Sequence, residues 1–176
     1  MKIIIIGCPG AGKSVLTRRL KEFLNYPVMH LDKVYHTIGK AHITREELVK
    51  EINKFANTYE NWIIDGNYIS TLEMRVKLAD TIILLNIPSD ICLKNVYDRE
   101  KEYIKNRVNR ADMAKGFDGT VNKEFVSFIK NFEKDTLVKI ENILEAYNDK
   151  DIKIISNYSE LNEFVKNFKR YDNIHF

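Results

Sequence analysis

The amino-terminal segment of the chain joins an unbroken apolar run to a glycine-rich loop and then to a helical pattern. The run from Lys2 to Ile6 is β-branched, which is typical of a central parallel strand buried on both faces. The octapeptide from Gly7 to Ser14 reads Gly-Cys-Pro-Gly-Ala-Gly-Lys-Ser, and the apolar residues from Lys13 to Leu24 recur at helical spacing. This order of strand, loop and helix predicts a phosphate-binding loop in an α/β fold.

The loop also predicts how phosphate would be bound. Its glycines permit positive φ, so that successive main-chain N–H groups and the positive end of the helix dipole point at phosphate oxygens. Lys13 is expected to reach the β- and γ-phosphates as a catalytic residue, and the Ser14 hydroxyl to ligate Mg²⁺. The predicted nucleotide-binding residues are Gly7, Cys8, Pro9, Gly10, Ala11, Gly12, Lys13, Ser14 and Val15.

Length and composition predict one soluble domain. A chain of 176 residues is large enough for a single core, and 44% hydrophobic with 30% charged residues is ordinary for a globular protein. Two cysteines give no disulfide framework, which favours a cytoplasmic location. No apolar stretch approaches the ~20 residues that span a bilayer, so no membrane contact is expected.

Basic residues gather between Arg99 and Lys115. This segment has six basic and three acidic residues, an excess equal to the net charge of +3 of the whole chain. Arginine binds phosphate in a bidentate manner, which makes Arg99, Arg107 and Arg110 candidate catalytic residues that clamp phosphate. A solvated helix face with ion pairs is the alternative interpretation.

Five apolar runs alternate with helical patterns, which predicts a five-stranded parallel sheet flanked by helices. The expected strands are Lys2–Ile6, Pro27–Leu31, Trp62–Asp65, Thr81–Ile87 and Ile152–Ser156. Capping boxes are expected at Thr44 with Glu47 and at Ser70 with Glu73. A long helical pattern with an aromatic stripe runs from about Asn122 to Tyr147 and predicts packing against the sheet.

Ligands of open parallel sheets gather at the carboxyl ends of the strands, so the residues there are candidates for the site. Asp65 follows three apolar residues and is placed to hold Mg²⁺ together with Ser14, directly or through water, or else only to form a turn with Gly66. Asp32 follows His30-Leu31 and can orient or deprotonate an acceptor hydroxyl, or simply cap a helix. Arg75 can pair with an anionic acceptor or form a surface salt bridge.

Two resemblances to known families follow from these segments. An early phosphate loop, an Asp-Gly after the third strand and an arginine-bearing segment after the fourth are similar to the adenylate kinase-like phosphotransferases. That likeness implies the three-layer P-loop NTPase fold with strand order 2-3-1-4-5 and an arginine-bearing lid, here about residues 99–121 of a single domain 1–176. The chain has no Asn-Lys-x-Asp segment of the kind that reads guanine in GTPases.

The second resemblance is narrower. The segments Trp62-Ile-Ile-Asp-Gly-Asn-Tyr, Asp80-Thr-Ile-Ile and Arg110-Ala-Asp-Met-Ala-Lys-Gly resemble the DNA topology modulation protein family, whose members are kinase-like. By this resemblance Asp65, Asn67 and Tyr68 border the acceptor site, and the three clustered arginines belong to the lid. With Asp32 and Arg75 these residues complete the predicted substrate site.

The sequence therefore predicts an ATP-dependent phosphotransferase that uses Mg²⁺ and transfers the γ-phosphoryl group to a small acceptor such as a nucleotide or nucleoside. One alternative is a nucleotide-switched regulator that affects DNA topology, although the modest charge gives no footprint for duplex DNA. A kinase of a sugar or another small metabolite is a further alternative.

Overall fold

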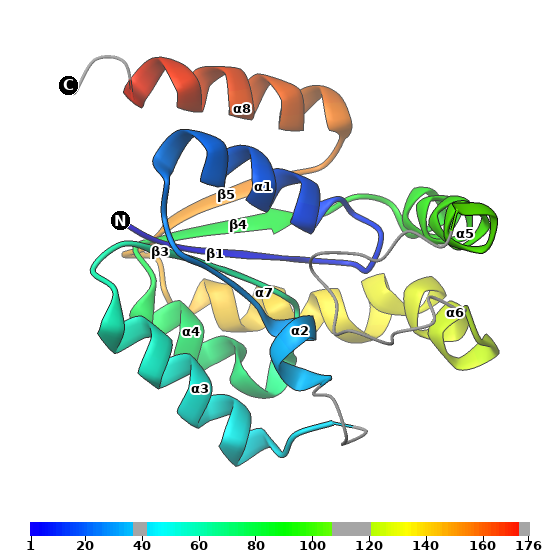
Figure 1. Cartoon of the computed structure of the whole chain (residues 1–176), viewed down its shortest axis with the longest axis horizontal. Coiled ribbons are helices and arrows are strands. Elements are labelled where there is room, and N and C mark those ends of the chain that lie inside the picture. The colour runs from blue at the N-terminus through cyan, green and yellow to red at the C-terminus, as the bar shows by residue number, and fades with distance from the viewer. Residues whose placement is uncertain (37–41, 107–120, 173–176) are drawn as a thin grey trace.

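The computed structural model describes residues 1–36, 42–106 and 121–172, and it contains a five-stranded parallel sheet. The strand order is β2-β3-β1-β4-β5, as predicted. Every predicted strand is present, with bounds shifted by one or two residues at some ends (Figure 1). The strands are β1 (Lys2–Gly7), β2 (Val28–His30), β3 (Trp62–Asp65), β4 (Thr81–Leu85) and β5 (Asp151–Ile155).

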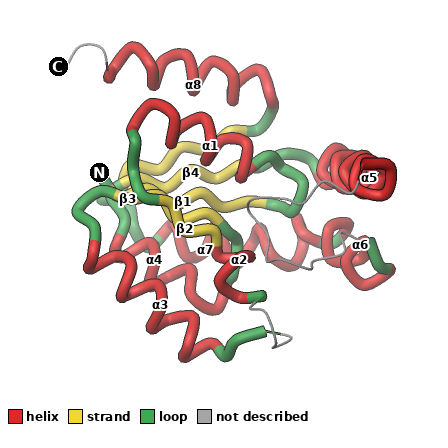
Figure 2. The backbone as a smooth tube through the Cα atoms, in the orientation of Figure 1, coloured by secondary structure: helices red, strands yellow, loops and turns green. Residues whose placement is uncertain are grey.

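Helices cover both faces of this sheet and give the predicted three layers. Figure 1 shows α1 and α8 on one face and α3, α4 and α7 on the other, while α5 and α6 lie beyond the carboxyl ends of the strands. The backbone trace in Figure 2 shows the same arrangement of helix around strand. The helices are α1 (Lys13–Leu24), α2 (Leu31–Tyr35), α3 (Arg45–Thr58), α4 (Leu72–Leu78), α5 (Ser89–Asn106), α6 (Lys123–Lys130), α7 (Val138–Glu145) and α8 (Tyr158–Asp172).

The core lies along the three central strands. Ile3, Ile4, Ile5 and Ile6 of β1 are fully buried, because helices cover both sides of the strand that stands in the middle of the sheet. The edge strand β5 differs, and its Ile154 is 57% exposed. Among residues 1–36, 42–106 and 121–172, no helix is long and apolar enough to cross a membrane.

One of the two predicted capping boxes is present. At the start of α3, the Thr44 hydroxyl accepts a hydrogen bond from the Glu47 N–H, and the Glu47 carboxylate accepts one from the Thr44 N–H. The box predicted at Ser70 is wrong, because Ser70 lies inside a 3₁₀ turn, Ile69–Thr71, and α4 begins only after it. The Glu73 carboxylate instead pairs with Lys77 one turn further along α4.

The long helical pattern near the carboxyl terminus forms three connected pieces. A π-helical segment, Phe132–Leu137, separates α6 from α7. Ile129 and Phe132 are buried as predicted, but Phe128 is 43% exposed. The stripe is only partly covered because α6 packs beside α5 at the end of the sheet and not beneath it (Figure 1).

Candidate functional site

The predicted phosphate-binding loop connects β1 to α1 and has the backbone that its glycines allow. Gly7, Gly10 and Gly12 have φ values of 142°, 91° and 98°, a region that other residues rarely adopt. Among the described residues no side chain caps the start of α1, where Gly12 is the N-cap, whereas α3 has its complete capping box. No side chain therefore occupies the amino-terminal end of α1, and the helix dipole favours an anionic ligand there.

The loop packs directly on the backbone of two other elements. A Cβ on Gly7 would lie 2.4 Å from the Leu85 carbonyl oxygen of β4, and one on Gly10 would lie 2.2 Å from the Cys92 carbonyl oxygen of α5. The thiol of Cys8 lies beneath the loop, where a hydrogen bond with Cys92 and burial raise its pKa. This thiol is a neutral packing group at ordinary pH.

The Lys13 side chain folds back onto the start of the loop. Its Nζ donates hydrogen bonds to the Gly7 carbonyl at 2.9 Å and the Cys8 carbonyl at 3.1 Å. The Lys13 carbonyl accepts a hydrogen bond from the Thr17 hydroxyl at 2.9 Å, one turn further along α1. The ammonium group is thus held at the concave side of the loop, where phosphate oxygens would lie.

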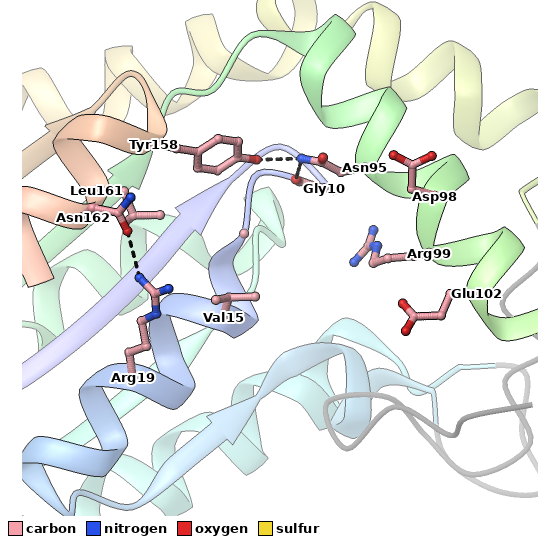
Figure 3. A pocket seen from close by; sticks show the side chains of 11 residues that line it. Gly10, Val15, Arg19, Asn95, Asp98, Arg99, Glu102, Tyr158, Leu161 and Asn162 are labelled. Carbon is pink, nitrogen blue, oxygen red and sulfur yellow. Dashed lines mark hydrogen bonds between the residues drawn. The ribbon is translucent and has the colours of Figure 1, made fainter. Parts of the chain in front are cut away.

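A cavity of about 500 Å³ opens beside the loop, between α1, α5 and the start of α8 (Figure 3). The Arg99 side chain extends from α5 into this space (Figure 3). The cavity is lined by Gly10, Gly12, Val15, Arg19, Asn95, Asp98, Arg99, Glu102, Tyr158, Leu161 and Asn162. Its position beside the loop makes it the candidate site for the base and sugar of a nucleotide.

Asn95 and Tyr158 join this cavity to the loop. The Asn95 amide donates hydrogen bonds to the Gly10 carbonyl at 2.9 Å and to the Tyr158 hydroxyl oxygen at 2.6 Å (Figure 3). Burial raises the pKa of Tyr158, which keeps the phenol neutral. Neither residue is among the predicted site residues, although the sequence places Tyr158 just after the fifth strand.

A second group of polar residues lies at the carboxyl ends of β2 and β3. His30 and Asp65 are register partners on these neighbouring strands, and His30 Nδ1 lies 3.0 Å from Asp65 Oδ2. Asp65 is 4% exposed, and because a carboxylate oxygen accepts, Nδ1–H of His30 is the donor in this contact. Sequence reasoning placed both residues at strand ends but did not pair them, because the register of parallel strands is not visible in the chain.

The predicted residues Asp32 and Tyr68 contact one another at the same edge. The Tyr68 hydroxyl donates a hydrogen bond to Asp32 Oδ1 at 2.9 Å, and burial together with the Asp32 charge raises the pKa of this tyrosine. The Tyr68 ring also packs on Tyr35, with 4.9 Å between the ring centroids. Asn67 lies beside them, and its Oδ1 is buried without a hydrogen-bond partner within the described ranges.

Arg75 stabilises the turn that follows β3 at this edge. It is fully buried and donates to the Gly66 carbonyl at 2.9 Å, the Tyr68 carbonyl at 2.9 Å and the Thr71 hydroxyl at 3.3 Å. Burial lowers its pKa to about 9, partly offset by Asp65, so the guanidinium is charged at neutral pH. The burial of Arg75 overturns the alternative of a surface salt bridge, whereas its pairing with an anionic acceptor stays a prediction.

The other predicted residues differ in how the structure describes them. Arg99 lies in α5 and lines the cavity beside the loop, while Arg107 and Arg110 lie outside the described residues. Ser14 is the second residue of α1, and Asp65 ends the strand beside β1. In the part of the chain that the structure describes, no group of three or more His, Cys, Asp or Glu side chains is arranged to hold a metal.

No protein-family model and no curated protein matches this chain. Among solved structures it is similar to deoxyadenosine kinase from M. mycoides with bound dATP, at 15% identity and a TM-score of 0.57, over 96% of this chain and 99% of that one. It is also similar to shikimate kinase from Bacteroides thetaiotaomicron, at 17% identity and a TM-score of 0.57, over 97% of each chain. A third similar structure is shikimate kinase from Acinetobacter baumannii in complex with shikimate, at 15% identity and a TM-score of 0.55, over 95% of this chain and 89% of that one.

The class that the loop, the strand order and these likenesses define is the P-loop kinase fold. Identities of 15% to 17% do not fix a substrate. The resemblance to the DNA topology modulation protein family is not confirmed by these comparisons and stays a prediction.

Proposed function

We propose that this protein is a small kinase that transfers the γ-phosphoryl group of ATP to a small acceptor molecule. The observation that carries the proposal is the loop from Gly7 to Ser14, which combines three positive-φ glycines, an uncapped helix start and the inward-held Lys13. The polar edge of β2 and β3 lies one strand away from the loop, since β3 pairs directly with β1. The proposed donor and acceptor sites therefore adjoin one another.

The donor site follows from the loop and the cavity beside it. The triphosphate would lie on the loop N–H groups, with its base and sugar in the cavity that contains Arg99 and Tyr158. Lys13 would exchange its two carbonyl partners for the β- and γ-phosphate oxygens. This exchange keeps the ammonium hydrogen-bonded before and after the nucleotide binds.

The side chains present fit a magnesium ion that is shared with the nucleotide. A hydroxyl and a carboxylate are oxygen ligands that Mg²⁺ accepts, and Ser14 and Asp65 would supply them, Asp65 directly or through water. Bound there, Mg²⁺ would neutralise charge on the transferred phosphoryl group. The Nδ1–H of His30 would meanwhile hold the Asp65 carboxylate in a fixed orientation.

The arginine cluster would complete the phosphate contacts. We propose that the chain acts as one domain, 1–176, whose segment of about 99–121 closes over the donor. Arg99 would approach from α5, and Arg107 and Arg110 would follow in the lid. Arginines that stabilise the transferred phosphoryl group contribute about 10³ to 10⁵ in rate in related chemistry.

A binding and transfer experiment tests the proposal. Calorimetry of the purified chain with Mg²⁺–ATP should show saturable binding, and a screen with γ-labelled ATP should move label to a nucleoside, nucleotide or sugar. Absence of heat with every magnesium–nucleotide complex, from folded protein, would refute a nucleotide site. Nothing in the described residues favours a DNA-topology regulator over a kinase.

A further inference from the structure

The edge formed by β2, β3 and the residues after them, here called the acceptor edge, presents hydrogen-bond acceptors. Asp32 uses one carboxylate oxygen to accept from Tyr68, and a carboxylate can accept several more bonds. Asp65 accepts from His30. The buried Asn67 Oδ1 adds a third acceptor that has no partner among the described residues. Buried acceptors of this kind require hydrogen-bond donors.

The positive charge at this edge is already committed to the protein. Arg75 is fully buried, and its guanidinium donates to the carbonyls of Gly66 and Tyr68. These two carbonyls belong to the turn that presents Asn67, so the guanidinium shapes the turn from behind. The hydrogen bonds that the structure gives this guanidinium all go to the protein itself.

Two other side chains that can be cationic, Arg45 and His30, also have partners within the described structure. The Nε of Arg45, at the start of α3, donates to the Ser70 carbonyl at 3.1 Å on the surface. His30 is paired with Asp65. Among the described residues, the hydrogen bonds that reach the two carboxylates come from Tyr68 and His30, and none comes from a guanidinium or an ammonium group.

This balance decides between two classes of acceptor. A phosphate monoester is an anion that offers acceptor oxygens and requires donors, most often arginine. Next to Asp32 it would meet like charge in a partly buried setting. A neutral molecule with several hydroxyls offers O–H donors, which are what the acceptor edge lacks.

We propose that the acceptor is an uncharged, hydroxyl-rich molecule of the nucleoside or sugar class, and not a nucleoside monophosphate. This inference rests on the proposed kinase function and narrows its acceptor. Hydroxyls of the acceptor donate to Asp32 and to Asn67, and the aromatic rings of Tyr68 and Tyr35 pack against its ring.

The transfer step is balanced for such an acceptor. The oxygen of one acceptor hydroxyl forms a bond to the γ-phosphorus, and the bond from that phosphorus to the β,γ-bridging oxygen breaks. The hydroxyl proton passes to the Asp32 carboxylate and then to solvent. The products are ADP, the phosphate monoester of the acceptor and one proton.

The test compares acceptors that differ only by one phosphate. The wild-type chain with Mg²⁺ and γ-labelled ATP is offered nucleosides beside their 5′-monophosphates, and hexoses beside their 6-phosphates. We expect kcat/KM for at least one neutral member to exceed that of its monophosphate by about 100-fold. Equal or better transfer to the monophosphate overturns the proposal, and so does transfer to no neutral member.

Both failures are distinguishable from failure of the kinase function itself. If Mg²⁺–ATP binds in calorimetry while neutral acceptors are refused, only the acceptor class is wrong. If Mg²⁺–ATP does not bind at all, the kinase proposal fails as well.

A charge-removing variant provides a second measurement. Asp32→Asn is expected to raise KM for the neutral acceptor about 10-fold or more and to leave KM for ATP unchanged. Asp149→Asn, at an exposed position, serves as the control and should change neither value. If Asp32→Asn leaves KM for the neutral acceptor unchanged, Asp32 does not bind the acceptor hydroxyls and the inference is overturned.

Discussion

The two halves of the proposed site are built from opposite chemical groups. The donor half presents hydrogen-bond donors, namely main-chain N–H groups and the Lys13 ammonium, on a loop fixed by backbone contacts. The acceptor half presents oxygen atoms of side chains. The turn between them is stabilised by the buried Arg75, which donates to the main-chain carbonyls of Gly66 and Tyr68. This difference supports the proposal that one half receives an anion and the other receives hydroxyl groups.

The largest effect is expected when the donor half loses its cation. Lys13→Ala should lower the phosphoryl-transfer rate by about 10³-fold or more, because Lys13 is the one basic residue of the segment from Gly7 to Ser14. Steady-state transfer and a thermal melt of the same sample measure rate and fold together. Lys21→Ala, in the exposed last turn of the same helix, should retain full activity. Full turnover by Lys13→Ala would show that the donor half does not depend on this cation.

The acceptor half should fail when its buried charge is removed. Arg75→Leu leaves the Gly66 and Tyr68 carbonyls without their donor and Asp65 without a nearby positive charge. We expect a loss of about 3 to 4 kcal/mol in the free energy of unfolding, measured by denaturant titration. Lys77→Ala on the exposed side of the same helix should leave the midpoint unchanged. A stable Arg75→Leu protein with normal acceptor KM would show that the guanidinium does not shape the turn.

Substitutions at two glycines of the loop distinguish the cost of backbone strain from the cost of a steric clash. Gly10→Ala should cost about 2 to 3 kcal/mol, because its φ is 91° and the new Cβ would lie 2.2 Å from the Cys92 carbonyl oxygen. Gly12→Ala has a similar φ of 98°, but its nearest neighbour is a Tyr158 ring carbon at 3.8 Å, so a loss of about 1 kcal/mol is expected. Chemical denaturation of both variants gives the difference. Equal losses would mean that φ alone sets the cost.

The smallest effect concerns the link between the donor cavity and the loop. Tyr158→Phe removes the oxygen that accepts from Asn95 and keeps the ring beside Gly12. We expect about a 5-fold rise in KM for ATP, near 1 kcal/mol, with kcat and acceptor KM retained. Tyr97→Phe, at a partly exposed position of α5, is the matched control. If Tyr158→Phe changed only the KM for the acceptor, Tyr158 would belong to the acceptor half of the site and not to the donor half.

Sequence patterns predicted the strands of the sheet, α1 and the whole loop, since these features depend on local spacing, whereas the strand order was implied by the resemblance to the adenylate kinase-like phosphotransferases. The β-branched run of β1 and the positions of the glycines constrain the backbone within a few residues. The prediction failed at Ser70, where a 3₁₀ turn replaced a capping box, and at Phe128, which α6 leaves exposed. In both cases the packing of other elements overrode a local pattern.

The sequence by itself determined that this chain forms a phosphate-binding loop on a parallel α/β sheet, because a strand, eight loop residues and one helix contain all the geometry required. Only the tertiary structure decided that His30 pairs with Asp65, that Asn95 joins Tyr158 to Gly10, and that Arg75 faces inward. These contacts join residues from separate elements. His30 and Asp65 are 35 positions apart in the chain, and Asn95 is 63 positions from Tyr158 and 85 from Gly10. Their partners are chosen by strand register and helix packing, which no local window of sequence contains.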